Sequence, residues 1–265
     1  MKPFLKWAGG KFRLVDTLKK HFPQGKRFVD PFFGSGAVSL NVDYPDYFAN
    51  DANGQLVDFW IALRNKGPIF IAKCEALFDE NNNTKDRYFE IRQAFNFGQI
   101  GPEAFLYLNR HGFNGLCRYN KNGLFNVPFG RYDHPYFPRK ELEAALEFAK
   151  KLTMTCGDFT AVFDKVREGD VVYCDPPYVP LSSTASFTSY SKGGFGMEAQ
   201  LKLVRCVEDA AMFGATVIVS NHDTPITRDL YKNADEIHTL DVQRNISCNG
   251  AKRGKAKELI AVYRP

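Results

Sequence analysis

Residues 170–178 read Asp-Val-Val-Tyr-Cys-Asp-Pro-Pro-Tyr, an apolar run followed by a carboxylate, two prolines and a tyrosine. A short apolar run of this kind predicts a buried strand, and the two prolines prevent it from continuing as a hydrogen-bonded ladder. Ligands of α/β sheets bind at the carboxyl ends of the strands. We therefore expect Asp175, Pro176 and Tyr178 to line a ligand site at the end of a central strand.

The same residues suit an amino group attached to a planar ring. The Asp175 carboxylate and the carbonyl groups of the prolines accept hydrogen bonds, and the Tyr178 ring offers a flat face for stacking. A rigid turn without a ligand is the alternative interpretation of these four residues in isolation.

A second strand is expected at 27–30, before the glycine turn Pro31-Phe32-Phe33-Gly34-Ser35-Gly36 and a helix over 37–42. The turn lacks the full G-x-G-x-x-G pattern, which disfavours NAD. A further strand at 47–49 leads to Asp51, which could accept hydrogen bonds from a ribose diol or cap the following helix.

The remaining pattern predicts a split α/β domain. Helical spacing over 54–105 predicts three or four short helices, Asn122-Gly123 predicts the turn of a hairpin over 113–132, and helices are expected at 139–152 and 197–213. Further strands are expected at 153–156, 215–219 and 259–263. We expect an α/β domain formed by 1–53 and 139–265, interrupted by a helical-plus-hairpin insertion over 54–138.

Composition narrows the class of protein. The chain has 265 residues, 44% hydrophobic and 25% charged, which is typical of a folded protein of one or two domains. No apolar run is long enough for a transmembrane helix, and the N-terminus lacks a secretory signal. The six cysteines are scattered without metal-ligand spacing, so we expect reduced thiols, no bound metal and a cytoplasmic location.

The charge distribution favours an anionic partner. The net charge is only +5, but 111–132 holds three Lys or Arg residues and no acidic one, and 244–257 holds five and none. Two solvated basic loops are the alternative, although two acid-free segments in one chain favour a nucleic-acid surface.

The sequence resembles the DNA adenine methyltransferases of the Dam type over essentially its whole length. The stretches that carry the resemblance are Phe4-Leu5-Lys6-Trp7-Ala8-Gly9-Gly10-Lys11, Pro31 to Gly36, Asn109 to Asn120, Phe125 to Tyr132, Asp175 to Tyr178 and Ser220-Asn221-His222-Asp223-Thr224. The resemblance implies a Rossmann-like methyltransferase sheet with an inserted target-recognition domain that carries a β-hairpin.

The resemblance also implies S-adenosylmethionine as cofactor and the adenine of GATC in duplex DNA as target, flipped out of the helix and methylated on its 6-amino group. The catalytic residues would be Asp175, Pro176 and Tyr178. The cofactor would be bound by Trp7, Lys11, Phe33, Gly34, Asp51, Asp158, Phe159 and Asp175. No metal and no obligate protein partner are expected, and the enzyme would act in the cytoplasm of a bacterium, either as a bacterial or as a phage-encoded protein.

For DNA, the resemblance implies that Phe113 and Asn114 take over the stacking or pairing that the duplex gives up at the flipped base. Leu116 and Pro128 would contact thymine and Arg118 guanine, consistent with the match between a guanidinium and the major-groove acceptors of guanine. Lys6, Asn120, Arg131 and Tyr132 are the remaining candidate phosphate or base contacts.

The chain departs from the family pattern at Phe113, where relatives often have tyrosine, and at Asp133, where they often have a basic residue. Two other functions stay open at this point. One is methylation of another planar amine or amide, in RNA or a protein glutamine, although glutamine-modifying relatives typically carry asparagine in place of Asp175. The other is a non-catalytic DNA-binding relative, which a cofactor-binding assay would distinguish.

Overall fold

The computed structural model of the chain describes residues 1–179, 195–243 and 255–265. The chain forms two compact units: Met1–Thr17, Phe33–Asp43 and Ala49–Gly157 make the first, and Leu18–Phe32, Tyr44–Phe48 and Asp158–Pro265 the second. The functional division at residues 53 and 138 remains a prediction. Among the described helices, none combines the length and apolar character needed to cross a bilayer.

The described strands form a sheet of order β3-β2-β1-β4-β5-β7-β6. Their bounds are β1 Arg27–Asp30, β2 Asp46–Asp51, β3 Leu152–Cys156, β4 Asp170–Cys174, β5 Thr216–His222, β6 Glu236–Gln243 and β7 Lys255–Tyr263. β4 pairs in parallel with β1 and β5, whereas β7 runs antiparallel to β5 and β6. The order β3-β2-β1-β4-β5 is that of a doubly wound sheet, so the expected Rossmann-like fold is confirmed.

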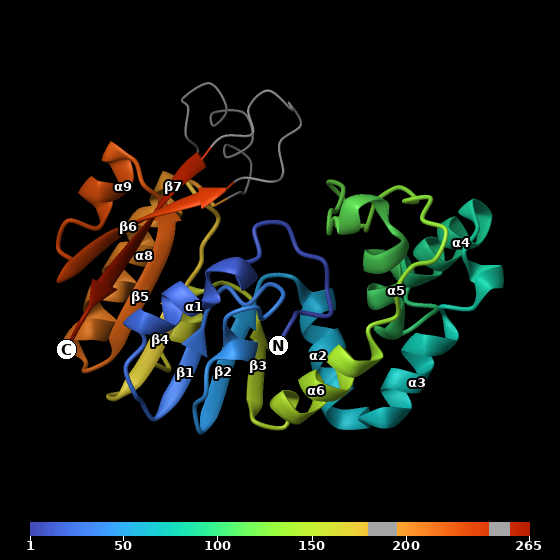
Figure 1. The fold of residues 1–265 in the computed structure, drawn as a ribbon, viewed down its shortest axis with the longest axis horizontal. Helices are drawn as coiled ribbons and strands as arrows, with labels where there is room; N and C mark the ends of the chain where they lie inside the picture. The colour runs from blue at the N-terminus through green and yellow to red at the C-terminus, as the bar shows by residue number, and fades with distance from the viewer. Residues whose placement is uncertain (180–194, 244–254) are drawn as a thin grey trace. The chain divides into compact units, whose positions relative to one another are not determined.

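The second unit contains β1, β4, β5, β7 and β6 of this sheet (Figure 1). All five residues of β4 are buried, as expected for a parallel strand covered on both faces. Val29, Val172 and Val217 belong to one apolar core with Leu203 and Val207 of α8. The helices of this unit are α7 Thr160–Phe163, α8 Met197–Met212 and α9 Pro225–Leu230.

The first unit is mainly helical. Its helices are α2 Gly54–Lys66, α3 Pro68–Ala76, α4 Lys85–Asn96, α5 Glu103–His111 and α6 Arg139–Ala149. The Asn53 side chain accepts from the backbone of Gln55 and Leu56, and Thr84 caps α4 in the same way. Pro68 occupies the first position of α3, where its missing N–H costs nothing. These caps explain why the segment breaks into short helices, as the sequence predicted.

Six short elements complete the connections among the described residues. α1 covers Val15–Leu18, and 3-10 turns lie at Phe12–Leu14, Lys19–His21 (η2), Ser39–Asn41, Glu80–Asn82 and Phe113–Gly115. The helix expected over 37–42 is wrong, because only the 3-10 turn Ser39–Asn41 forms there. Gly36 has φ of +68° and the backbone is extended again at Val42, so only one short turn forms between them.

The predicted hairpin is looser than expected. Antiparallel bridges join Gly112 to Phe129 and Tyr119 to Phe125, but the structure assigns no continuous ladder there. The turn at Asn122-Gly123 is confirmed, since the Gly123 backbone N–H donates to the Asn120 carbonyl at 3.0 Å. β6 was not predicted, and residues 244–254 of the second acid-free segment lie outside the described residues.

Candidate active site and DNA interface

The glycine turn after β1 is built against Trp7. Gly34 has φ of +52°, and a Cβ added there would lie 2.9 Å from the Trp7 indole nitrogen. Any larger residue at position 34 would therefore be strained and would also collide with the indole. The Gly34 N–H donates to Asp51 Oδ2 at 2.8 Å, so the turn, the indole and the end of β2 form one cluster in the first unit.

Asp51 faces this turn instead of capping a helix. Its Oδ1 accepts from the Asn53 backbone at 2.9 Å, and Asn53 itself caps α2, so the capping alternative for Asp51 is wrong. Burial raises the pKa of Asp51, although the two backbone N–H groups oppose the shift. The carboxylate is therefore an acceptor held in a poorly solvated place.

Lys11 and Phe33 complete the predicted cofactor residues of this unit. The Lys11 side chain is only 7% exposed, and its ammonium donates to the Gly9 carbonyl at 3.1 Å. The Phe33 ring is buried edge-on against Trp60, with centroids 5.3 Å apart, so its side chain packs in the core. A role of Phe33 in cofactor binding would thus come from its backbone.

These residues fit S-adenosylmethionine. Asp51 offers a carboxylate for the two hydroxyls of a ribose, and Lys11 offers a cation for the carboxylate of the amino-acid end. The fit rests on this chemistry and on the Gly34 turn, which fixes the Asp51 carboxylate through its backbone N–H.

Donor affinity is expected to fall as the pH is lowered through the raised pKa of Asp51. The acceptor is the ionised carboxylate, so binding is strong above that pKa and weakens below it, at a higher pH than for an ordinary aspartate. Calorimetric titration of S-adenosylmethionine over a pH series measures this. Asp51→Asn should bind more weakly at neutral pH and lack the step, and a wild type whose affinity is flat over the series contradicts the assignment.

Asp158 and Phe159 lie in the second unit. Asp158 is exposed, and its Oδ1 accepts from the Thr160 backbone at 3.0 Å and from the Thr160 hydroxyl at 2.5 Å, which lowers the pKa of Asp158. Phe159 is buried against Phe32 and Phe195, with centroids 5.3 and 5.4 Å apart. The predicted contact of both residues with the cofactor's adenine remains a prediction.

Asp175, Pro176 and Tyr178 follow β4 directly, at the carboxyl end of the strand as predicted. The Tyr178 hydroxyl donates to Glu258 Oε2 at 3.2 Å, and the His222 ring lies edge-on to the tyrosine ring at 4.7 Å. Burial raises the pKa of Tyr178 well above its ordinary value, and the charges of Asp175 and Glu258 add to the shift. Tyr178 therefore stays protonated, and its ring is fixed from two sides.

A buried amide pair holds the backbone of this motif. Gln200 Nε2 donates to the Pro177 carbonyl at 2.8 Å, and Asn221 Oδ1 accepts from the Val179 N–H at 3.1 Å. Asn221 is 0% exposed, donates to Gln200 Oε1 and to the Tyr231 hydroxyl, and also accepts from the His222 N–H at 2.9 Å. The resemblance included Asn221 without a role, and Gln200 was missed because a lone glutamine on a helix carries no sequence signal.

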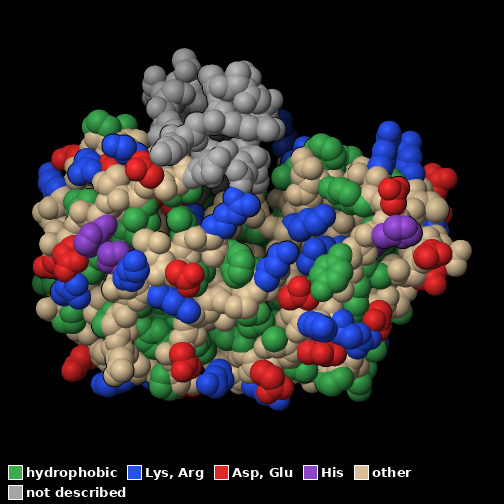
Figure 2. Space-filling model, viewed as in Figure 1, with side chains coloured by type: hydrophobic (Ala, Val, Ile, Leu, Met, Phe, Trp, Pro, Cys, Tyr) green, Lys and Arg blue, Asp and Glu red, His purple; other side chains and the backbone are tan. Residues whose placement is uncertain are grey.

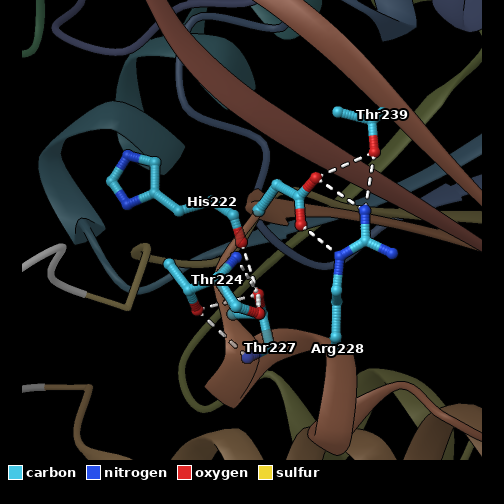
Figure 3. A network of polar contacts seen from close by, with 6 residues as sticks. His222, Thr224, Thr227, Arg228 and Thr239 are labelled. Atoms are coloured by element: carbon cyan, nitrogen blue, oxygen red, sulfur yellow. Dashed lines mark hydrogen bonds and ion pairs between the residues drawn. The ribbon is translucent and has the colours of Figure 1, made fainter.

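The segment after Asn221 is fixed by the polar network of Figure 3. The Thr227 hydroxyl donates to the His222 carbonyl at 2.5 Å, and Thr224 and Thr227 form a capping box at the start of α9. Arg228 binds both carboxylate oxygens of Asp223, at 2.6 and 2.8 Å, and holds the pKa of Asp223 below its ordinary value. The network therefore anchors the residue whose ring contacts Tyr178.

The hairpin in the first unit presents Arg118 on its surface. Arg118 Nε donates to Asn126 Oδ1 at 2.9 Å and Nη2 to the Asn126 carbonyl at 3.0 Å, so the exposed guanidinium is oriented across the hairpin. The Asn120 side chain accepts from the backbone of Asn122 and Leu124, which makes it a turn-forming residue. A DNA contact of Asn120 would have to use its amide NH₂ or its backbone.

Next to the hairpin, Phe113 is 47% exposed and Asn114 adopts φ of +54°. The Asn114 backbone donates to the Tyr132 hydroxyl at 2.9 Å, and the Lys6 ammonium lies 4.3 Å from the Tyr132 ring centroid. The structure therefore brings Lys6, Asn114 and Tyr132 together from three separate stretches of sequence.

Asn109 joins Lys6 to this region and was matched in sequence without a role. It is buried, accepts from the Lys6 N–H and donates to the Lys6 carbonyl, both at 2.8 Å, and donates to the Gly115 carbonyl at 3.1 Å. A Cβ on Gly115 would collide with the Lys6 side chain, so only glycine fits there.

The other predicted DNA contacts lie on the same unit, with Pro128 and Arg131 exposed and Leu116 half-buried. Basic and acidic side chains are interspersed over the face drawn in Figure 2. On that face, local residues rather than one continuous basic patch would have to supply the attraction for DNA.

Comparison with known proteins identifies the family of the chain. Residues 7–246 match the family of D12 class N6 adenine-specific DNA methyltransferases. The chain is 44% identical to a DNA adenine methylase of Vibrio cholerae, over all of this chain and 96% of the relative, and 42% identical to one of Escherichia coli K12 with the same coverage. The chain therefore belongs to the D12 class N6 adenine-specific DNA methyltransferase family, and it is an adenine-specific DNA methyltransferase that uses S-adenosylmethionine.

Proposed function

We propose that the enzyme methylates the 6-amino group of adenine within GATC in double-stranded DNA, and that it does so after flipping the base. The observation that carries the chemistry is the motif 175–178, fixed at the end of β4 by Gln200, Asn221 and Glu258. The relatives at 42–44% identity are DNA adenine methylases. We also propose that it acts in the cytoplasm without an obligate protein partner.

The motif would act by orienting a weak nucleophile. The adenine amino nitrogen shares its lone pair with the ring, so it attacks poorly unless both hydrogens are held out of the plane. We assign one hydrogen to the Asp175 carboxylate and the other to the Pro176 carbonyl, which favours a pyramidal nitrogen. S-adenosylmethionine, when bound, supplies an electrophilic methyl group on a positively charged sulfur. Positioning and electrostatics would then supply most of the rate enhancement.

We expect base flipping because the adenine amino group is inaccessible to the motif while the base is stacked in the duplex. A paired 6-amino group inside a duplex cannot reach Asp175, so the adenine must leave the stack, at a cost of a few kcal/mol. Stacking on the Tyr178 ring would return about 1–3 kcal/mol. The ring is suited to this because Glu258 and His222 fix its orientation.

DNA reading is assigned to the first unit. Arg118 would read guanine through its guanidinium, and Leu116 and Pro128 would contact thymine. The exposed Phe113 ring and Asn114 would occupy the space left by the adenine. Lys6, Asn120, Arg131 and Tyr132 would hold phosphates or base edges.

Sequencing of methylated adenines in duplex DNA incubated with enzyme and donor tests the proposed site. Methylation confined to GATC supports the proposal. Methylation at another sequence contradicts the site, whereas modification only of RNA or of protein glutamine contradicts the substrate.

Arg118→Ala is expected to lower discrimination at one guanine by about 1–3 kcal/mol. Its loss removes the guanidinium, which donates to Asn126 in this structure and would turn N–H groups to the base acceptors when DNA binds. The kcat/KM should therefore fall on GATC and change little on sites substituted at that guanine. Arg118→Lys keeps the charge without the planar fork and should also lose discrimination. Lys121→Ala, an exposed cation in the same hairpin, is the matched control. Equal weakening on all sites would make Arg118 a phosphate contact.

A fluorescent purine in place of the target adenine is expected to report the flip, because stacking quenches such bases. Binding should raise the emission unless Tyr178 quenches it again, so Tyr178→Ala is measured in parallel and should show the larger rise. Replacing Phe113 and Asn114 together should reduce the flipped population. No change in either background at saturating protein, with a donor analogue bound, would contradict base flipping.

A further inference from the structure

Three possible metal ligands meet in the second unit, away from the residues assigned to the reaction. His21 ends the 3-10 turn η2, and Glu236 and His238 lie on β6. Residues i and i+2 of a strand point to the same face, so Glu236 and His238 project together towards one side of β6. Among the described residues, His21, Glu236 and His238 are the group of His, Cys, Asp or Glu side chains that could hold an ion.

The ligand atoms of this His-Glu-His cluster (His21, Glu236 and His238) all lie within 4.8 Å of one another. The two imidazole rings are 4.4 Å apart between centroids, and His238 Nε2 and Glu236 Oε2 are hydrogen-bonded at 2.9 Å, so an ion bound by both atoms would replace the proton between them. Two ligands of a tetrahedral zinc ion are about 3.4 Å apart, given metal–ligand distances near 2.0–2.1 Å. All three side chains are half-buried, and ligand atoms as far apart as 4.8 Å would have to approach by about 1.4 Å to reach that spacing.

The donor chemistry selects a class of ion. Two imidazoles and one carboxylate are the ligands of zinc and of related first-row divalent ions, whereas calcium and magnesium prefer oxygen sets. Glu236 Oε1 is held by Arg264 at 2.5 Å, which leaves Oε2 directed at His238. Such outer hydrogen bonds orient ligands in metal sites. Arg264 and Lys20 also place positive charge near His21, so the imidazole lone pairs and the Glu236 carboxylate, rather than a surplus of negative charge, would carry the binding.

We propose that His21, Glu236 and His238 bind one zinc-type divalent ion, with water completing the coordination. β6 ends the strand order and pairs with β7 alone among the described strands. An ion held by both η2 and β6 would tie this edge strand to the segment that leads into β1. The site would act on stability and takes no part in methyl transfer.

Calorimetric titration of zinc chloride into the full-length, tag-free, chelator-treated protein tests the site. We expect one equivalent to bind, with affinity lowered at least about tenfold in His238→Ala and in His21→Asn. His134→Ala removes an exposed histidine of the other unit and should bind as the wild type does. The cysteines are present in every variant, so binding of one equivalent that persists undiminished in His238→Ala would overturn the proposal, as would its absence from the wild type.

Thermal unfolding with and without zinc gives a second measurement that does not depend on how stable each variant is. Zinc should raise the Tm of the wild type and of His134→Ala, and leave that of His238→Ala and His21→Asn unchanged, because an ion that binds only the folded state stabilises it. An equal rise in all four proteins would overturn the proposal. Methyl transfer by His238→Ala at a temperature where it is folded should equal that of the wild type.

Discussion

Replacing Asp175 by alanine is expected to reduce methyl transfer at least about 100-fold, while the fold and much of the donor affinity persist. Asp175 follows β4, and its main proposed partner is the target amine, although the family resemblance also places it among the donor-binding residues. The effect should appear in kcat, measured by single-turnover methylation of a GATC duplex. Donor affinity, measured by calorimetry, should change much less.

Asp175→Asn separates charge from shape. The amide keeps one oxygen acceptor in the same place but loses the negative charge, so its activity should lie between those of the wild type and the alanine variant. Either variant could lose activity through misfolding, which its thermal unfolding and donor binding would reveal. An Asp175→Ala protein that is folded and keeps a tenth of wild-type turnover contradicts the catalytic role.

Asn221→Ala is expected to lower the free energy of unfolding by about 3 kcal/mol, and kcat by up to about 100-fold. The Asn221 side chain accepts hydrogen bonds from the N–H groups of Val179 and His222. It donates hydrogen bonds to the side chains of Gln200 and Tyr231. A buried polar group left without a partner costs about 1–3 kcal/mol. The kinetic loss follows because Val179 comes directly after Tyr178, and small displacements of catalytic groups cost up to about 100-fold in rate.

Chemical denaturation and steady-state kinetics below the unfolding transition measure the two effects separately. Asn233→Ala is the matched control, since Asn233 is exposed in the same unit and donates to Glu208 at 2.9 Å. It should change stability by less than about 0.5 kcal/mol. An Asn221→Ala enzyme with reduced stability but wild-type kcat would show that the amide supports the fold without positioning Tyr178.

The sequence predicted the elements whose signal is local. The apolar run of β4 and the two prolines after it specify a buried strand and its end, and both lie where expected. The helix expected over 37–42 failed because its apolar spacing is short and the turn geometry at Gly36 dominates. β6 was missed because Glu236, His238 and Asp241 interrupt any clear apolar alternation.

Contacts between distant stretches could not be predicted from spacing. Nothing in the sequence around Gln200 indicates that its amide supports Pro177, 23 residues earlier. The same holds for Asn109, which binds the backbone of Lys6 from 103 residues away. Such contacts depend on the tertiary fold, and the sequence revealed Asn109 and Asn221 only as parts of matched stretches without a role.

Lys6 and Trp7 are adjacent in the chain but contact different parts of the first unit. Trp7 lies against Gly34 in the turn proposed to receive the donor, and Lys6 lies over Tyr132 with its backbone held by Asn109. Because one peptide bond joins the two residues, a ligand that shifts either backbone also shifts the other, so we expect donor binding and DNA binding to be coupled. Thermodynamic linkage requires the coupling to be reciprocal, so DNA must change donor affinity by the same factor by which donor changes DNA affinity.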